Sequence, residues 1–330
     1  MTKTLGLALG TGGARGWAHV GVIRAFEEAG IKVDYLAGTS IGALVGAIYM
    51  VGKLDQLETF AQEASFSELV PLMDISFPGV GLLQGDRVYR FIADYVADHW
   101  LEDAPIPFHC VATNFLQKQE VIIDGGPMVQ AVRASISIPG IFAPFKHQEN
   151  VYLVDGGIIN PLPISVVRAM GADVVVAVNL NSDTTIDHED IITQSPAAHS
   201  AENHQSEPKP VNDAQSAVDS KSTEAADSAA LATLANRYEA LKGVLNDQLD
   251  NWIPDAETGI NIFDVLGNSI NVMEKRVTEI NLLVDKPDVL IDPPLSEFGT
   301  FDFHQAQTIM PRGYEAAKAM IPSIQALLQD

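Results

Sequence analysis

The chain has 330 residues, 47% of them hydrophobic, so it is long enough to bury the core of an ordinary α/β domain. Its formal net charge of −23 would repel a phosphate backbone, which argues against nucleic acid as a partner. A single cysteine excludes a disulfide framework, and the apolar run around Cys110 predicts a buried core residue.

The first fifty residues predict two successive strand–helix units. Residues 5–9 form a short apolar run typical of a buried strand, and apolar side chains at helical spacing then lead from Trp17 to a helix stop at Gly30. Residues 33–37 predict a second strand and residues 43–51 a second helix. Strand, helix, strand and helix in this order indicate a parallel sheet with right-handed crossovers.

The five residues Gly38-Thr39-Ser40-Ile41-Gly42 lie between the second strand and the second helix. A G-x-S-x-G sequence in this position is the pattern of a nucleophile elbow, which exposes a serine hydroxyl at the end of a strand. Gly38 and Gly42 let the backbone pass close by without Cβ clashes. Because Ser40 would start a helix, the helix dipole would also favour a developing alkoxide there.

The apolar side chains of residues 69–83 are interrupted by prolines and glycines, which predicts a loop. It either packs on the core or forms a lid over an apolar pocket. Further along, a turn Asp155-Gly156-Gly157 directly follows a predicted strand. The other predicted elements are helices at 86–97, 128–134 and 164–170 and strands at 108–112, 120–123, 151–154 and 174–178.

The composition changes after residue 180. Residues 181–230 hold ten acidic and two basic residues and almost no aromatic side chains, so we expect a flexible acidic insertion that is disordered. Its three histidines are too scattered to predict a metal site. Residues 231–330 predict helices around 234–252 and 262–283, a strand at 289–291 and a final helix at 313–328. We expect this part to complete the α/β core begun by residues 1–180.

Three glycine-rich turns follow predicted strands: the turn after residue 9, the Ser40 elbow and the Asp155 turn. Because ligands of open α/β sheets bind beyond the carboxyl ends of strands, we expect the three turns to converge. Asp155 is then the best candidate for the base that a serine nucleophile requires. Backbone N–H groups of Gly12, Gly13 and Ala14 at a helix start are candidate donors to an oxyanion.

Together these residues resemble the patatin-like phospholipase family, in its bacterial branch. Gly12-Gly13-Ala14-Arg15-Gly16 is similar to the family's oxyanion motif, residues 38–42 to its serine elbow, and Asp155-Gly156-Gly157 to the motif that bears its dyad aspartate. Residues 134–139 and Asn160-Pro161 also fit. The likeness covers residues 4–180 well and 286–328 loosely. Thr11 departs from it, because many members have the first glycine of the oxyanion motif there.

The resemblance implies a three-layer α/β fold with a mainly parallel central sheet. It also implies a lipid acyl hydrolase of phospholipase A or lysophospholipase type, with Ser40 as nucleophile and Asp155 as general base. Neither a metal nor an organic cofactor is implied. Arg15 would organise the oxyanion loop or attract an anionic head group, unless it forms a surface salt bridge.

Three other interpretations remain open. An α/β-hydrolase triad would need His304, the histidine that follows Asp155 outside the insertion. A dinucleotide-binding fold would use Gly10-x-Gly12, but Arg15 occupies the place of the third glycine and the expected acidic residue is missing. A third alternative is a catalytically silent protein on the same fold that binds acyl lipids or acts as a regulator.

We expect no secretory signal, because glycines and Arg15 interrupt the N-terminal apolar stretch. The uncharged run from Tyr35 to Gly52 contains the elbow and is expected to be a buried strand-turn-helix, not a membrane span. The sequence thus predicts a cytoplasmic protein that acts on a lipid or small ester and contacts membranes or micelles transiently. It does not specify an oligomeric state.

Overall fold

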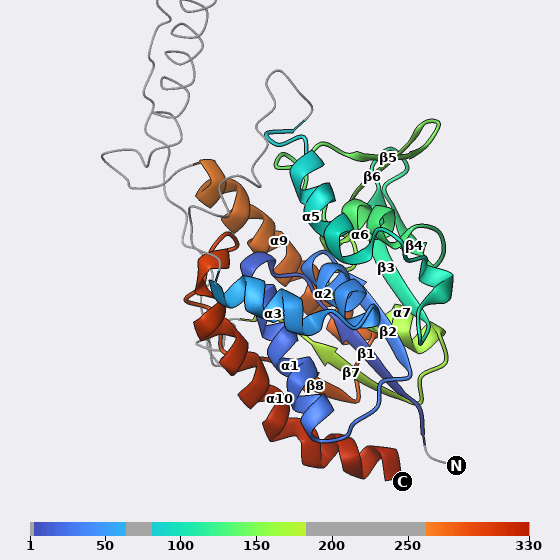
Figure 1. Cartoon of the computed structure of the whole chain (residues 1–330), viewed down its shortest axis with the longest axis vertical. Coiled ribbons are helices and arrows are strands. Elements are labelled where there is room, and N and C mark those ends of the chain that lie inside the picture. Colours follow the sequence, from blue (N-terminus) through green and yellow to red (C-terminus); the bar gives the residue numbers. More distant parts are fainter. Residues whose placement is uncertain (1–2, 64–80, 183–261, 330) are drawn as a thin grey trace, which may run out of the picture. The chain divides into compact units, whose positions relative to one another are not determined.

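The computed structural model of the chain describes residues 3–63, 81–182 and 262–329, which are built around one central β-sheet (Figure 1). The strand order is β5-β6-β3-β2-β1-β7-β8, and β4 pairs with β3 outside this path. The strands are β1 (Leu5–Leu9), β2 (Tyr35–Thr39), β3 (Phe108–Asn114), β4 (Gln119–Ile123), β5 (Phe145–Gln148), β6 (Val151–Asp155), β7 (Val174–Val178) and β8 (Val289–Ile291).

Strands β3, β2, β1, β7 and β8 run parallel to one another, whereas β4, β5 and β6 add antiparallel pairs at the β3 end. The central strands β1 and β7 are buried along their whole length. A strand that is covered on both faces needs apolar side chains on both sides, and the sequences of β1 and β7 are apolar throughout. The predicted α/β class with a mainly parallel sheet is therefore confirmed.

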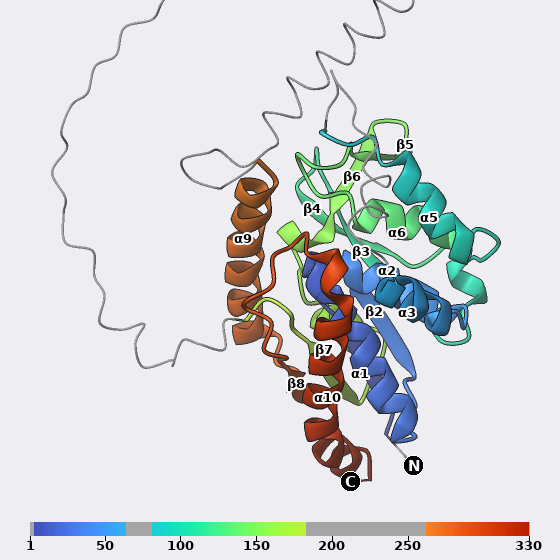
Figure 2. The same ribbon diagram turned by 60° about the vertical axis from the view of Figure 1, so that its left-hand side comes forward.

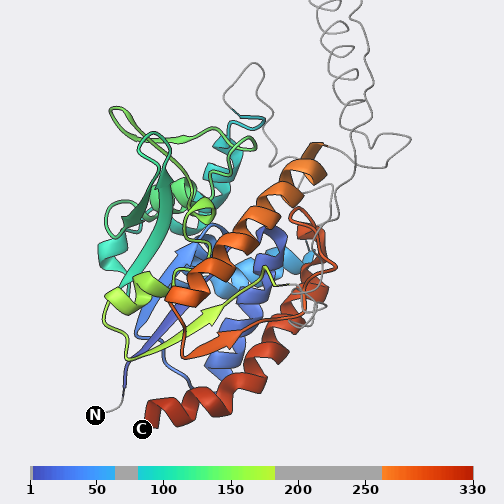
Figure 3. The ribbon, with the colours of Figure 1, turned by 180° about the vertical axis from the view of Figure 1, so that it is seen from behind.

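Helices cover both faces of the sheet. On one face, seen in Figures 1 and 2, lie α1 (Trp17–Glu28), α2 (Ile41–Met50), α3 (Leu54–Glu63), α5 (Asp86–Val96), α6 (Met128–Ser135) and α10 (Ala306–Gln329). On the other face, seen from behind in Figure 3, lie α7 (Ile164–Ala169) and α9 (Ile262–Val284). The described residues thus form three layers.

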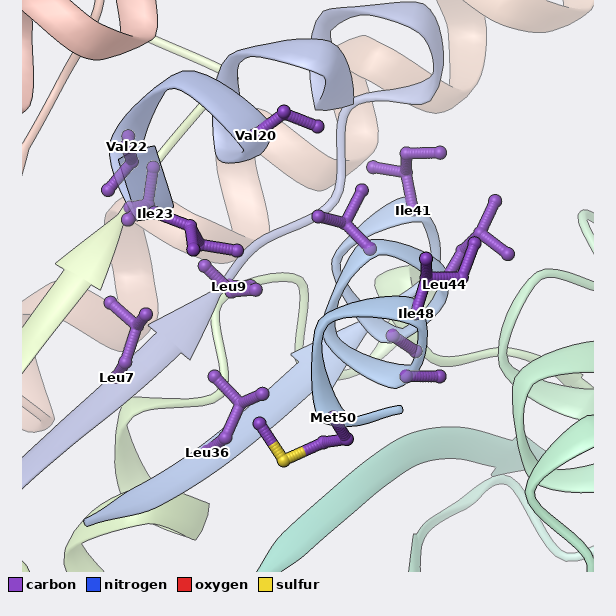
Figure 4. Packing of buried hydrophobic residues seen from close by; sticks show 14 of the residues in the cluster. Leu7, Leu9, Val20, Val22, Ile23, Leu36, Ile41, Leu44, Ile48 and Met50 are labelled. Carbon is purple, nitrogen blue, oxygen red and sulfur yellow. The ribbon is translucent and has the colours of Figure 1, made fainter. Parts of the chain in front are cut away.

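The alternation of side chains along β1 decides which helices can approach each face. Leu7 and Leu9, with Leu36 of β2, point toward α1 and α2, where Ile23 and Ile48 complete the packing (Figure 4). The small residues of β1 face the opposite way. A Cβ at Gly6 would lie 2.0 Å from a methyl carbon of Val167 in α7, so this short helix packs directly against the backbone of β1.

Most predicted elements occur within a residue or two of their expected ends. The strand predicted at 33–37 begins at residue 35 instead, because it has to pair with β1 from Gly6 onward. The final helix starts at Ala306 and not at residue 313, and it continues through Pro311, which lies inside the helix although it removes one N–H from the helical hydrogen bonds. Among the α-helices and strands of the described residues, two were not predicted, α3 and β5.

The C-terminal part contributes β8 to the sheet beside β7 and packs α10 against α1. The first two residues of the predicted acidic insertion pack on the described core, since Asn181 is buried and the Ser182 hydroxyl donates to Asp292 Oδ1 at 2.7 Å. The rest of the predicted acidic insertion, the predicted helix at 234–252 and residues 69–80 of the predicted loop lie outside the described residues. Across the described stretches, every helix is too short or too polar to cross a membrane.

Candidate active site

Ser40 occupies the sharp turn between β2 and α2, with φ 57° and ψ −121°. This backbone conformation is strained for a residue with a side chain, and such strain is concentrated at functional sites. The turn packs tightly, since a Cβ at Gly42 would lie only 2.2 Å from the carbonyl oxygen of Leu9. The structure therefore forms the elbow that the glycines predict, and Ser40 is 5% exposed at its tip.

Asp155 lies next to Ser40 because β2 and β6 pair with the same edge of β3 and run toward each other. Thr39 pairs with Val111 in the parallel β2–β3 ladder, and Asp155 pairs with the next residue, Ala112, in the antiparallel β3–β6 ladder. β4 occupies the other edge of β3. The two turns therefore converge as predicted, although β6 arrives antiparallel and not side by side with β2.

The side chains of Ser40 and Asp155 are directly hydrogen-bonded. Ser40 Oγ donates to Asp155 Oδ2 at 2.5 Å, and the N–H of Gly157 donates to Asp155 Oδ1 at 2.7 Å. Burial raises the pKa of Asp155 to about 7, against the lowering effect of these two hydrogen bonds. Near neutral pH this carboxyl is therefore divided between its ionised and its protonated form.

Residues 135–137, which belong to a stretch that fits the family resemblance but had no predicted role, hold both members of this pair. The N–H of Ser40 donates to Ser135 Oγ at 2.9 Å, and Ser135 Oγ donates to the carbonyl of Val111 at 2.6 Å. The N–H of Asp155 donates to the carbonyl oxygen of Ser137 at 2.9 Å. Ser135 is completely buried, so its hydroxyl is a fixed link between the elbow and β3.

The glycine-rich turn after β1 runs into the short 3-10 helix η1 (Gly13–Gly16), and Gly13 has φ 56°. The predicted donor role of Ala14 is wrong for this arrangement, because its N–H donates to the carbonyl of Thr300 at 2.8 Å. Within the described residues, the N–H groups of Gly12 and Gly13 have no acceptor. These two N–H groups are therefore available to donate hydrogen bonds to a ligand.

Arg15 is 3% exposed, which rules out a surface salt bridge. Its Nε donates to the carbonyl of Gly12 at 3.3 Å, and its Nη2 donates to Asn271 Oδ1 on α9 at 2.8 Å. Arg15 therefore stabilises the glycine-rich turn after β1 from its buried side. The segment after Asp155 adds two further ties, since Thr11 donates to the carbonyl of Pro161 and Thr39 Oγ1 to that of Asn160.

An apolar cavity of about 160 Å³ adjoins Ser40. Its lining is almost entirely hydrophobic and comes from α1, α2, α3, α5, residues 136–142 and residues 300–303, with large contributions from Trp17, Leu44, Phe60, Phe91, Phe142 and Phe303. Leu83, at the end of the predicted loop, also lines it and donates its N–H to Ile141 at 2.7 Å. No role in a pocket was predicted for these aromatic residues from the sequence, because they come together only in the folded chain.

The remaining candidates lie elsewhere. His304 is exposed in the 3-10 helix η6 (Phe303–Gln305), whereas the Ser40 hydroxyl is bonded to Asp155. His19 is buried, with Nε2 2.8 Å from the carbonyl oxygen of Gly10, and burial lowers its pKa to about 4. Cys110 is buried as predicted. The described stretches contain no cluster of three acidic, histidine or cysteine side chains that could hold a metal ion.

Glu274 is a buried polar residue of the site that the sequence did not predict. It lies on α9, is 7% exposed, and accepts a hydrogen bond from Thr11 Oγ1 at 2.8 Å. In the sequence it is one acidic residue of a mixed helix, and no local pattern distinguishes it from the exposed Glu279 on the same helix. Only the packing of α9 against the Asp155 turn brings its carboxyl into the site.

Residues 7–168 match the family model described as patatin-like phospholipase. An uncharacterized NTE family protein of Mycobacterium tuberculosis is 40% identical over 175 residues, which are 53% of this chain and 48% of that protein. Lysophospholipase NTE1 of Mycosarcoma maydis is 30% identical over 323 residues, 96% of this chain but 15% of that protein. The chain thus spans about half the length of its mycobacterial relatives and a small part of the fungal one.

A solved structure, that of VipD from Legionella pneumophila, matches 98% of this chain and 67% of its own with a TM-score of 0.52. At 14% sequence identity this likeness shows the fold alone. The glycine-rich turn, the elbow and the Asp155 turn all fall within the matched residues 7–168. Through residues 7–168, the chain belongs to the patatin-like phospholipase family.

Proposed function

We propose that the chain hydrolyses carboxylic esters of lipids through an acyl intermediate on Ser40, with Asp155 as general base. The observation that carries the proposal is the 2.5 Å hydrogen bond from Ser40 Oγ to Asp155 Oδ2. A serine hydroxyl becomes a competent nucleophile when an adjacent base takes its proton. With a pKa of about 7, Asp155 is a stronger base than an ordinary aspartate and is still partly ionised at neutral pH.

The reaction would proceed in two halves. Ser40 Oγ bonds to the carbonyl carbon while its proton moves to Asp155, and the bond to the alcohol oxygen then breaks as the alcohol leaves with that proton. Water next attacks the acyl group and gives one proton to Asp155. The bond to Ser40 Oγ breaks, Ser40 recovers the proton from Asp155, and the carboxylic acid is released.

Negative charge develops on the carbonyl oxygen in both tetrahedral intermediates. The N–H groups of Gly12 and Gly13 are the proposed donors, since they have no acceptor among the described residues. Preorganised backbone donors of this kind typically contribute about 10²–10³-fold each to turnover. Arg15 would support them from behind through its hydrogen bond to the Gly12 carbonyl.

The apolar cavity beside Ser40 supports a substrate with a hydrocarbon acyl chain, because such a lining gains free energy by covering apolar surface. The name of the fungal relative, lysophospholipase NTE1, points to lipid esters of the same class. Such a substrate would be taken from a micelle or a membrane surface. Nothing in the cavity selects a head group, so we propose the class and not the individual lipid.

The test is labelling with a fluorophosphonate, which forms an adduct only with an activated serine, on the full chain and on Ser40→Ala. We expect mass spectrometry to locate one adduct on Ser40 and none on the variant. Hydrolysis of p-nitrophenyl esters and of lysophosphatidylcholine should disappear in the same variant. A well-folded chain without adduct and without turnover would refute the proposal and favour an acyl-lipid-binding protein.

A further inference from the structure

Glu274 connects three parts of the site that are far apart in the sequence. Its Oε2 accepts hydrogen bonds from Thr11 Oγ1 at 2.8 Å and from Asn181 Nδ2 at 3.3 Å, and Asn181 Nδ2 also donates to Thr11 Oγ1 at 2.8 Å. These three side chains are at most 7% exposed. They come from the turn after β1, the segment after β7, and α9.

The other carboxylate oxygen of Glu274 lies over the Asp155 turn. A Cβ built on Gly157 would be 2.2 Å from Glu274 Oε1 and 2.9 Å from Thr11 Cγ2. The N–H of Gly157 donates to Asp155 Oδ1. Glu274 is therefore packed directly against the residue that orients the general base, and a side chain on Gly157 would displace it.

Thr11, where the sequence departs from the family's glycine, now has a physical role. Its hydroxyl donates to Glu274 and accepts from Asn181, while its N–H donates to the carbonyl of Pro161. A glycine at this position would leave the buried Glu274 carboxyl without one of its donors. Arg15 adds a second tie to α9 through Asn271, so the oxyanion turn is attached to this helix at two points.

We propose that Glu274 is a positioning residue of the active site: its carboxyl, held by Thr11 and Asn181 and packed on Gly157, fixes the oxyanion turn relative to Asp155. The inference rests on the proposed ester hydrolysis. It extends the site to α9, which lies outside the residues matched by the family model.

The two carboxyl groups cannot both be charged at low cost, because they are buried on either side of Gly157. Burial, and then the charge of Asp155, raise the pKa of Glu274 to about 8, while Thr11, Arg15 and Asn181 lower it. The two carboxyls therefore titrate as a pair, and the second proton leaves only at a higher pH than the first. Above about pH 8 the second charge forms next to the turn that has to stabilise the oxyanion, and turnover should fall.

The pH dependence of turnover therefore distinguishes a role that requires a particular charge on Glu274 from a role in packing alone. Glu274→Gln keeps the size of the side chain and a hydrogen-bond acceptor but cannot ionise. The decrease in turnover above pH 8 should therefore be absent, while the increase in turnover near pH 7 remains. Glu279→Gln on the same helix is the matched control, because Glu279 is exposed and pairs with Arg276. The control should keep the wild-type profile.

The experiment measures, on the full chain, the rate of fluorophosphonate labelling at Ser40 and kcat/KM for a soluble p-nitrophenyl ester between pH 5.5 and 9.5. An alkaline fall in the wild type and Glu279→Gln that is absent from Glu274→Gln supports the inference. A Glu274→Gln profile that superimposes on that of the wild type overturns it. A wild-type chain that neither labels at Ser40 nor hydrolyses any ester overturns the proposed function and this inference with it.

A second pair of variants tests the geometry independently of charge. Thr11→Val removes the hydroxyl at nearly constant volume and should lower kcat roughly 10- to 100-fold with little change in KM, as expected when a buried hydrogen bond is lost from catalytic support. Thr11→Ser restores the hydroxyl and should restore kcat. Equal kcat values for the valine and serine variants, with unchanged melting temperatures, would contradict the proposed role of this contact.

Discussion

Thr39 and Asp155, the last residues of β2 and β6, lie opposite two adjacent residues of one edge of β3, Val111 and Ala112. A parallel and an antiparallel strand therefore meet head-on, and the turn that follows each one contributes to the same hydrogen bond. This register places Ser40 Oγ 2.5 Å from a carboxylate that is 115 residues away in the sequence. The Ser40–Asp155 pair is thus positioned by backbone pairing, which is stiffer than a loop.

The raised pKa of Asp155 predicts the acidic side of the pH profile. The base form exists above the pKa, so kcat/KM for a soluble ester should rise with pH up to and through pH 7, before the fall expected above about pH 8. The measurement is initial-rate hydrolysis from pH 5 to 7.5, corrected for spontaneous cleavage of the ester. A rate that is already constant at pH 5 would mean that Asp155 has an ordinary pKa or is not the base.

Asp155→Asn should remove activity and increase stability at the same time. A carboxyl whose pKa is raised from 3.8 to about 7 binds its proton more tightly in the folded state, so its contribution destabilises the fold progressively as pH rises through this window. The melting temperature of the variant should therefore exceed that of the wild type by more at pH 8 than at pH 5. Asp98→Asn, at an exposed position, is the matched control. A gap that shrinks with rising pH would contradict the burial argument.

Ser135→Ala should weaken both the elbow and its chemistry. The change leaves the N–H of Ser40 and the carbonyl of Val111 without a partner in a buried place, which costs about 1–3 kcal/mol of unfolding free energy. We expect a lower midpoint of urea unfolding and a slower labelling of Ser40. Ser269→Ala, on the exposed side of α9, removes a hydroxyl without touching the site and should change neither quantity.

Leu44→Trp should shorten the range of acyl chains that the site accepts. Leu44 lines the cavity one helical turn beyond Ser40, so a larger side chain there would occupy the space proposed for the hydrocarbon. We expect kcat/KM for octanoyl esters to fall at least about tenfold relative to acetyl esters, since each lost buried methylene costs about 0.8 kcal/mol. Leu116→Trp, at an exposed position, should leave the ratio unchanged. An unchanged ratio in Leu44→Trp would place the acyl chain elsewhere.

His304→Ala distinguishes the dyad from a triad. His304 is exposed in η6, and the hydrogen bond of Ser40 goes directly to Asp155. The variant should therefore keep kcat for a soluble ester within about twofold of the wild type, because a catalytic base would contribute at least about 10²-fold. A loss of several orders of magnitude in a folded protein would instead identify His304 as the missing base of a triad.

The α/β class, most of the elements and the three glycine-rich turns could be predicted from the sequence alone. These are local properties: the apolar run of β7, the spacing of the apolar residues in α1, and the glycines that a tight turn requires all act within a few residues. The strained elbow at Ser40 follows from five consecutive residues. Asp155 could also be named, because the turn that carries it has its own glycine pattern.

The tertiary structure decided what surrounds those turns. The carbonyl of Thr300 takes the N–H of Ala14, which no pattern near Ala14 could reveal, because the partner comes from the other end of the chain. Glu274 enters the site only through the packing of α9 on the Asp155 turn, and the aromatic lining of the cavity is gathered from several helices. Long-range pairing and burial set these contacts, and with them the pKa values of Asp155 and Glu274, since desolvation depends on the whole fold.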